Sequence, residues 1–256
     1  MSLDRPALLQ GIVKLAREAG DRILTIYHQD FDIKVKDDSS PVTEADEAAE
    51  AIILTGLAEL TPDIPVLAEE AQAAGKEPDL SGGVFWLVDP LDGTREFINR
   101  RGDFTVNIAL VEHGVATMGV IHVPARETTY FAEGRGRVWR QNGNGAPVPI
   151  AVRTAPEDGL VVVASRSHRT PETDAYIEKF KVKELISAGS SLKLCLVAEG
   201  KADLYPRFGR TMEWDIGAGQ AILEAAGGTV ETVDGAPLRY GKAGYDNPFF
   251  IAKGRL

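Results

Sequence analysis

Cysteine is almost absent from this sequence, with one occurrence among 256 residues, at position 195. A single cysteine excludes an internal disulfide, which fits a protein that works in a reducing compartment. Because Cys195 lies in the apolar run L-K-L-C-L-V, we expect it to be a packing residue and not a reactive thiol.

Long hydrophobic runs are also missing. No apolar stretch approaches the roughly 18 residues that a membrane-spanning helix needs. Asp4 and Arg5 precede an amphipathic stretch and not the apolar core of a signal peptide. We therefore expect a cytoplasmic protein without a transmembrane segment.

Positive charge is in deficit. The chain has 28 basic and 38 acidic residues, which gives a net charge of −10. This balance argues against a general partner for nucleic acids or anionic membranes. It leaves an anionic small-molecule substrate open, because metal ions can reverse the local field.

The hydrophobic pattern predicts an α/β (α+β) chain. Helices are expected at 6–27 and 43–60, the second with Thr43 as N-cap, and a short strand at 66–70 ends in Glu69 and Glu70. Alternating segments at 104–112 and 115–123 flank H-G and predict a hairpin. Further strands and helices alternate after residue 160. The predicted units are residues 1–150 and 151–256, packed closely enough to count as one domain.

Two aspartates follow an apolar strand in the stretch W-L-V-D-P-L-D-G-T, at positions 89 and 92. Pro90 fixes one backbone dihedral angle and Gly93 permits an unusual one, so both carboxylates can face one point. Mg²⁺ prefers such oxygen ligands. The alternative is a solvated turn, because D-P-x-D-G is also good turn chemistry.

More acids occur near expected element ends: Glu69 after a strand, and Asp46 and Asp215 in the first turns of helices. Helix N-termini favour anions, so a carboxylate or a bound phosphate is sensible there. Each of these acids alone could equally be a cap or a surface charge. Spacing by itself does not predict that they converge.

The two motifs D-P-L-D-G-T (89–94) and W-D-I-G-A-G (214–219) resemble the two signatures of the inositol monophosphatase-like, lithium-sensitive, magnesium-dependent phosphatases. The resemblance extends over essentially the whole chain, with one small departure at Ala225, where the family usually has glutamate. It implies a layered αβαβα sandwich of the inositol monophosphatase and fructose-1,6-bisphosphatase type. It also implies two or three Mg²⁺ ions per site.

By this resemblance, residues of both motifs and the upstream acids acquire roles. Thr94, hydrogen-bonded to Asp46, would orient and help deprotonate the attacking water together with Glu69; the alternative for Thr94 is a simple turn hydroxyl. The implied metal ligands are Glu69, Asp89, Asp92, Asp215 and the carbonyl oxygen of Leu91. The implied contacts to the scissile phosphate and its surroundings are Glu69, Leu91, Asp92, Gly93, Thr94 and Asp215.

Three further stretches resemble the CysQ-type branch of this family, which acts on 3′(2′),5′-bisphosphate nucleotides: S-R-S-H (165–168), G-S-S-L-K (189–193) and L-Y-P-R (204–207). The implied substrates are adenosine 3′,5′-bisphosphate and the related phosphosulfate PAPS, in sulfur assimilation and nucleotide recycling. A second phosphate needs its own cationic cradle. The candidate residues are His168, Ser190, Ser191, Lys193 and Arg207, although a helical lysine is usually solvated and a lone histidine usually structural.

Two other functions stay open on the sequence. One is an inositol or sugar monophosphatase with the same metal chemistry, and the other is a non-catalytic regulatory protein that binds nucleotide or metal. The antiparallel region 104–140 is a candidate homodimer interface, and no nucleic-acid partner is expected. Attachment to the inner face of the cell membrane is suggested by the resemblance alone, because the sequence has no basic amphipathic helix to explain it.

Overall fold

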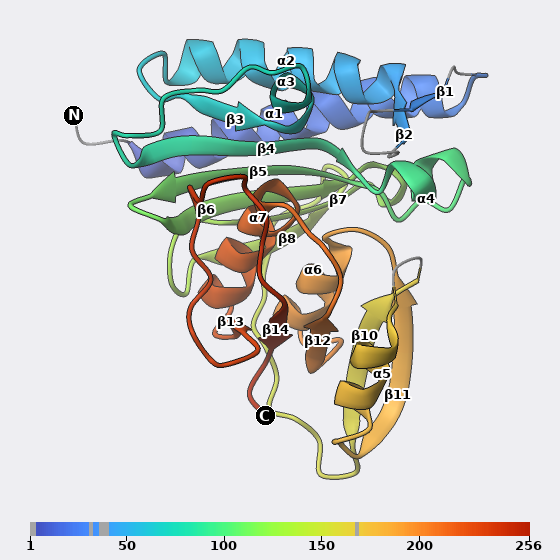
Figure 1. The fold of residues 1–256 in the computed structure, drawn as a ribbon. Coiled ribbons are helices and arrows are strands. Elements are labelled where there is room, and N and C mark those ends of the chain that lie inside the picture. The colour runs from blue at the N-terminus through green and yellow to red at the C-terminus, as the bar shows by residue number, and fades with distance from the viewer. Residues whose placement is uncertain (1–3, 31–32, 36–40, 167–168) are drawn as a thin grey trace.

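Two β-sheets alternate with three layers of helices in the computed structural model, which describes residues 4–30, 33–35, 41–166 and 169–256 (Figure 1). The order from one side is two helices, α1 (Arg5–Tyr27) and α2 (Glu44–Leu60), then the seven-stranded sheet, then α6 (Leu192–Ala198) and α7 (Glu213–Ala225), then the five-stranded sheet, and last α5 (Pro171–Ile177). This arrangement confirms the predicted αβαβα sandwich. His168 and residues 36–40 lie outside the described residues.

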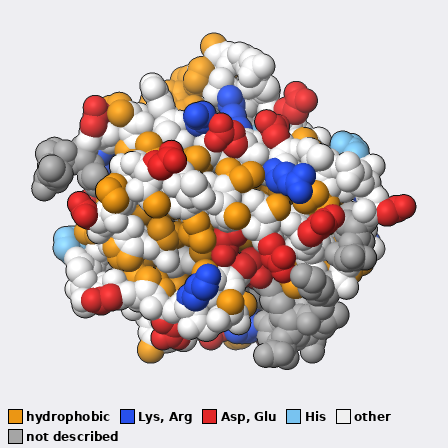
Figure 2. Space-filling view, turned by 90° about the horizontal axis from the view of Figure 1, so that it is seen from above, with side chains coloured by type: hydrophobic (Ala, Val, Ile, Leu, Met, Phe, Trp, Pro, Cys, Tyr) orange, Lys and Arg blue, Asp and Glu red, His pale blue; other side chains and the backbone are white. Residues whose placement is uncertain are grey.

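The outer helical layer consists of α1 (Arg5–Tyr27) and α2 (Glu44–Leu60). Asp4 caps the first helix, and Thr43 caps the second in a capping box with Asp46, as its sequence predicts. Apolar residues of both helices, among them Ile12, Ile23 and Ile53, are fully buried against the seven-stranded sheet. Figure 2 shows the opposite, outward face of this layer, where acidic side chains gather near the middle and basic ones are scattered.

The seven-stranded sheet has the strand order β3-β4-β5-β6-β7-β8-β9, and its strands follow one another along the chain. Only the β3–β4 pair is parallel, and the predicted hairpin around His113 and Gly114 is present between β5 and β6. The bounds are β3 (Val66–Ala68), β4 (Val84–Asp92), β5 (Thr105–Glu112), β6 (Val115–Val123), β7 (Thr128–Ala132), β8 (Val138–Asn142) and β9 (Val148–Pro149). A small sheet of β1 (Ile33–Val35) and β2 (Pro41–Thr43) precedes α2.

The strand predicted at 66–70 is shorter than expected. It ends at Ala68, and Glu69 and Glu70 instead begin the short helix α3 (Glu69–Ala73). The carboxylate of Glu50 on α2 accepts the Glu70 N–H at 2.8 Å. This tertiary contact satisfies one of the orphan amides of the first turn, which local sequence could not reveal.

The five-stranded sheet has the order β11-β10-β12-β14-β13, parallel among its first three strands and antiparallel at β14 and β13. The bounds are β10 (Leu160–Ser165), α5 (Pro171–Ile177), β11 (Val182–Ala188), α6 (Leu192–Ala198), β12 (Leu204–Arg207), α7 (Glu213–Ala225), β13 (Thr229–Thr232) and β14 (Phe250–Lys253). β11 and β13 escaped prediction because edge strands carry polar, partly exposed side chains and lack a continuous apolar run.

Helices α6 and α7 lie between the two sheets, and one hydrophobic cluster joins them to both. Cys195 is fully buried there, which confirms that it is a packing residue. The division into units 1–150 and 151–256 stays a prediction. None of the described helices is long and apolar enough to span a bilayer.

Candidate active site

A pocket of about 340 Å³ opens where the end of β4, the short helix α4 (Thr94–Ile98), the start of α6, the end of β12 and the start of α7 meet. It brings together most residues that the sequence singled out. The predicted site residues that line it are Glu69, Asp92, Gly93, Thr94, Ser190, Ser191, Lys193, Arg207 and Asp215.

The end of β4 explains the conjunction of an apolar strand and two aspartates. Asp89 is buried, and its Oδ1 accepts the N–H of Leu91 at 3.0 Å within the strand. The pairing of β4 with β5 shifts register between Asp89 and Asp92. Gly93 then adopts a left-handed conformation with φ 91°, so the chain leaves the strand and starts α4. Asp89 and Leu91 lie in the strand, outside the pocket lining, and Asp92 reaches the pocket.

Thr94 and Asp46 are in contact, as the sequence analysis predicts. The Thr94 hydroxyl lies 3.2 Å from Asp46 Oδ1 and 3.4 Å from the carbonyl oxygen of Leu91. The other carboxylate oxygen of Asp46 accepts both the N–H and the hydroxyl of Thr43, each at 2.8 Å. The capping box of α2 therefore fixes the carboxylate that faces Thr94.

The pocket carboxylates influence each other. Desolvation raises the pKa of Asp92 to about 6, and the nearby charge of Glu96 adds to the rise, while Lys193 and the Ser191 N–H oppose it. Desolvation also raises the pKa of Asp215 well above its usual value, followed by the charges of Asp92 and Glu69. Like charges that face one another in a poorly solvated pocket favour a bound cation.

The donor set fits a hard divalent cation, because it consists of carboxylate and carbonyl oxygens. The described residues contain no group of three or more His, Cys, Asp or Glu side chains already gathered closely enough to hold an ion. Instead, two of the carboxylates are engaged by backbone amides: Asp92 Oδ2 accepts the Ser191 N–H at 2.6 Å, and Asp215 Oδ2 accepts the Met212 N–H at 2.9 Å. Asp92 and Asp215 thus line the same pocket, and each is oriented by its own hydrogen bond to a backbone amide.

Two buried cations share this pocket with the acids. Lys193 is 4% exposed, its Nζ donates to the Ser190 carbonyl oxygen at 2.5 Å, and it lies 5.3 Å from the centre of the Tyr205 ring. Burial lowers the pKa of Lys193 to about 8, against the opposing effect of Asp92. Arg207 is also buried and donates to the carbonyl oxygen of Arg210 at 3.0 Å.

Asp103, which was not predicted as a site residue, holds the G-S-S turn (189–191) before α6. Asp103 is buried, forms ion pairs with Arg126 and Arg166, and accepts the Gly189 N–H at 3.2 Å. The Ser190 hydroxyl donates to the Asp103 carbonyl oxygen. Asp103 thereby joins the segment after β10 to the G-S-S turn, two stretches singled out separately.

The two serines of that turn already have protein partners. The Ser191 hydroxyl lies 2.7 Å from both Thr105 Oγ1 and Asn107 Oδ1, and its N–H is bonded to Asp92. Ser190 adopts a positive φ of 41°. Both residues line the pocket, and their role as substrate ligands stays a prediction.

Several further lining residues had no distinctive sequence signal. Glu96 is a buried acid on α4, only two positions after Thr94, and this proximity to the motif could have identified it. Arg210, Thr211 and Met212 precede the second motif and form the rim near α7.

Comparison with known proteins identifies the family and supports the fold. The model of the inositol monophosphatase family matches residues 4–252. The 3′(2′),5′-bisphosphate nucleotidase CysQ of Escherichia coli K12 is 47% identical over 235 residues, which cover 91% of this chain and 94% of the relative. CysQ of Haemophilus influenzae is 31% identical and covers 96% of this chain and 93% of its own length.

Comparison with solved structures identifies the same family. The crystal structure of CysQ from Bacteroides thetaiotaomicron superposes with a TM-score of 0.84 at 42% identity and covers 98% of both chains. An inositol monophosphatase from Thermotoga maritima superposes with a TM-score of 0.80 at 28% identity, covering 99% of this chain and 93% of the other. The family expected from the two motifs is confirmed, and the chain belongs to the inositol monophosphatase family.

Proposed function

We propose that this protein is a Mg²⁺-dependent, lithium-sensitive 3′(2′),5′-bisphosphate nucleotidase. Its reaction is the hydrolysis of the 3′-phosphate of adenosine 3′,5′-bisphosphate to AMP and phosphate, with PAPS as a second substrate. The relatives that are 47% identical over almost their whole length carry this activity in their names. The structural observation that carries the substrate assignment is the pair of buried cations, Lys193 and Arg207, in the same pocket as the acids.

The residues that would hold Mg²⁺ are the carboxylates of Glu69, Asp89, Asp92 and Asp215 and the carbonyl oxygen of Leu91, for two or three ions. When bound, Mg²⁺ supplies charge neutralisation for the phosphate and a lower pKa for the water that attacks it. Phosphoryl transfer depends mainly on such positioning and neutralisation.

The protein's own groups orient the reactants. Thr94 Oγ1, held by Asp46 Oδ1 at 3.2 Å, positions the attacking water together with Glu69. The water oxygen attacks phosphorus, the bond from phosphorus to the ribose 3′ oxygen breaks, and a proton passes to that oxygen as the alcohol leaves. The backbone amides of Gly93 and Thr94, at the start of α4, bind the phosphate oxygens.

The phosphate that is not cleaved binds on the cationic side of the pocket. Lys193 and Arg207 supply positive charge in a poorly solvated place, where charge-assisted hydrogen bonds are strong. Ser190 and Ser191 add donors, and His168, which lies outside the described residues, is proposed to contact ribose or phosphate.

Lys193→Met is expected to impair the bisphosphate selectively. The change keeps the buried stem and removes the charge, so kcat/KM for adenosine 3′,5′-bisphosphate should fall by roughly 30-fold or more, whereas kcat/KM for adenosine 3′-monophosphate should change little. Lys201→Met is the matched control, because Lys201 is exposed and paired with Glu199. Equal losses for the two substrates in Lys193→Met would show that the lysine does not bind the second phosphate.

An inositol monophosphatase is the second candidate, since solved inositol monophosphatases share this fold at about 28% identity or less. We expect Mg²⁺-dependent phosphate release to be fastest from adenosine 3′,5′-bisphosphate and to be inhibited by Li⁺. A phosphate-release assay across that substrate, PAPS and inositol 1-phosphate tests this. Equal or faster release from inositol 1-phosphate would contradict the substrate assignment, and no release from any ester would favour a non-catalytic binding protein.

The setting of this activity is proposed as the cytoplasm, in sulfur assimilation and nucleotide recycling. A homodimer through the antiparallel region 104–140 and attachment to the inner membrane face also stay predictions.

A further inference from the structure

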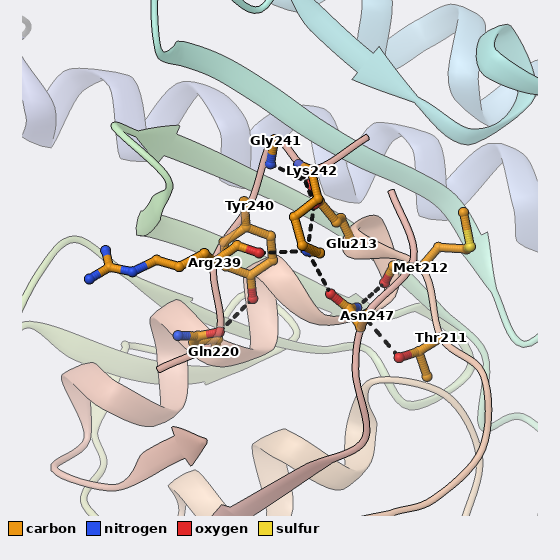
Figure 3. A network of polar contacts seen from close by, with 9 residues as sticks. All are labelled: Thr211, Met212, Glu213, Gln220, Arg239, Tyr240, Gly241, Lys242 and Asn247. Carbon is orange, nitrogen blue, oxygen red and sulfur yellow. Dashed lines mark hydrogen bonds and ion pairs between the residues drawn. The ribbon is translucent and has the colours of Figure 1, made fainter. Parts of the chain in front are cut away.

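The loop 239–247 near the C-terminus lies against the start of α7, the helix that carries Asp215 (Figure 3). The N–H of Glu213 donates to the Tyr245 carbonyl oxygen at 2.9 Å, and Met212 and Asp246 form an isolated antiparallel bridge. The loop thus runs along the segment 211–213, of which Thr211 and Met212 line the pocket.

One peptide group links this loop to the Asp215 carboxylate. The carbonyl oxygen of Thr211 accepts the N–H of Asn247 at 2.9 Å. The N–H of Met212, which belongs to the same planar peptide, donates to Asp215 Oδ2 at 2.9 Å. Because the peptide is rigid, holding its oxygen also aims its N–H, so Asn247 fixes the donor that orients Asp215.

The side chain of Asn247 holds the next peptide as well. Its Nδ2 donates to the Met212 carbonyl oxygen at 2.7 Å and to Thr211 Oγ1 at 3.4 Å, and its Oδ1 accepts from Lys242 Nζ at 3.3 Å. An ammonium group can only donate and a carbonyl oxygen can only accept, so these two neighbours determine which way the amide points. Figure 3 shows the bonds to Lys242, Met212 and Thr211 meeting at Asn247.

Glu213 in turn fixes Lys242. The Glu213 side chain is fully buried, and its two oxygens accept the N–H groups of Gly241 at 2.7 Å and Lys242 at 2.9 Å. Lys242 Nζ lies 2.6 Å from Glu213 Oε1 and also donates to the Arg239 carbonyl oxygen at 2.5 Å. Breaking the ion pair of a buried carboxylate is strongly destabilising. Glu213 therefore holds the Lys242 ammonium group in one position.

We propose that Glu213, Lys242 and Asn247 form a positioning relay that aims the Asp215 carboxylate for Mg²⁺ binding. The relay runs from Glu213 through Lys242 and Asn247 to the Thr211–Met212 peptide and so to Asp215. It rests on the proposed function in one respect, the assignment of Asp215 as a metal ligand. None of the three residues lines the pocket, so they are positioning residues and not catalytic ones.

Two variants test the relay. Asn247→Leu removes all three side-chain hydrogen bonds at similar size, and Lys242→Met removes the charge at similar length. Because partners of metal ligands contribute roughly 10- to 100-fold to metal affinity, we expect the Mg²⁺ dissociation constant of the substrate-free protein, measured by titration calorimetry, to rise about tenfold or more in both. Lys242→Arg keeps the charge and is expected to restore Mg²⁺ affinity to within about threefold of wild type.

Lys253→Met is the matched control for stability. Lys253 forms a similar ion pair with Glu231 at 2.9 Å, its side chain is 33% exposed against 31% for Lys242, and it lies outside the pocket. We expect it to lower the melting temperature by a similar amount while leaving the Mg²⁺ dissociation constant unchanged. If Lys242→Met does not fold, Asn247→Leu decides the test.

Asp215→Asn separates the two proposals. If Asp215→Asn weakens Mg²⁺ binding but Asn247→Leu and Lys242→Met affect only the melting temperature, the relay is overturned and the metal site stands. If Asp215→Asn leaves Mg²⁺ affinity unchanged, both the ligand assignment and the relay are overturned. The relay is supported if Mg²⁺ binds more weakly to Asp215→Asn, Asn247→Leu and Lys242→Met while Lys253→Met binds it as the wild type does.

Discussion

Thr94→Val is expected to lower kcat for adenosine 3′,5′-bisphosphate by roughly 10²- to 10⁴-fold, the range typical of a lost proton-transfer group. Valine keeps the shape and removes the hydroxyl that lies 3.2 Å from Asp46 Oδ1. The fold should persist, because Thr43 still satisfies the other oxygen of Asp46. Initial rates at saturating Mg²⁺ and substrate measure the effect.

The control for this prediction is Thr94→Ser, which retains a hydroxyl at the same position. We expect serine to restore at least a tenth of the wild-type kcat, and the melting temperatures of all three proteins to agree closely. A kcat for Thr94→Val within about threefold of wild type would instead identify Thr94 as a simple turn hydroxyl that also reaches the Leu91 carbonyl oxygen.

Asp92→Asn is expected to reduce kcat/KM by about three orders of magnitude, because one lost electrostatic partner of the transition state typically costs 10²- to 10³-fold and a weakened metal site adds to this. The same substitution should raise the free energy of unfolding in the absence of Mg²⁺. The folded-state pKa of Asp92 is raised from 3.8 to about 6, so stability from its protonated form is lost as the pH rises through that value.

At pH 7 the ionised Asp92 carboxylate therefore opposes folding, and the neutral amide should raise the metal-free stability by about 1–2 kcal/mol. Urea unfolding at pH 7 with and without Mg²⁺ measures this, and the gain in stability should disappear near pH 4.

The control is Asp203→Asn. Asp203 is buried and pairs with Arg153 through two hydrogen bonds of 2.8 Å, and it lies outside the pocket. It should lower stability without changing the Mg²⁺ requirement. An active Asp92→Asn protein, or one destabilised without metal, would contradict this account.

Local sequence was sufficient for the long, strongly patterned elements. The apolar spacing of residues 6–27 and the Thr43 cap predict α1 and α2 with errors of one residue at their starts. Edge strand β11 and the helical start at Glu69 were not predicted, because neighbouring elements and not local patterns stabilise them.

The site residues that could be predicted from the sequence are mainly those in the two motifs, 89–94 and 214–219. They identify Asp92, Thr94 and Asp215, and the predicted contact between Thr94 and Asp46 is present. Asp103 and Asn247 carried no such signal, although one fixes the G-S-S turn and the other the peptide that orients Asp215. Both act through contacts between segments that are far apart in the chain.

The amino-acid sequence by itself determined the family and the set of oxygen and cationic side chains available for chemistry. The layered architecture followed from the resemblance of two motifs to that family, whereas the hydrophobic pattern predicted individual helices and strands. Periodicity, capping and turn residues are short-range properties, so they can be recognised without a structure. The tertiary structure alone decided which of those side chains share one pocket, how far desolvation raises the pKa of Asp92, and which distant residues hold the Asp215 carboxylate in place. These depend on packing between segments far apart in the chain, such as those that carry Glu69 and Asp215, where no local preference specifies the partner.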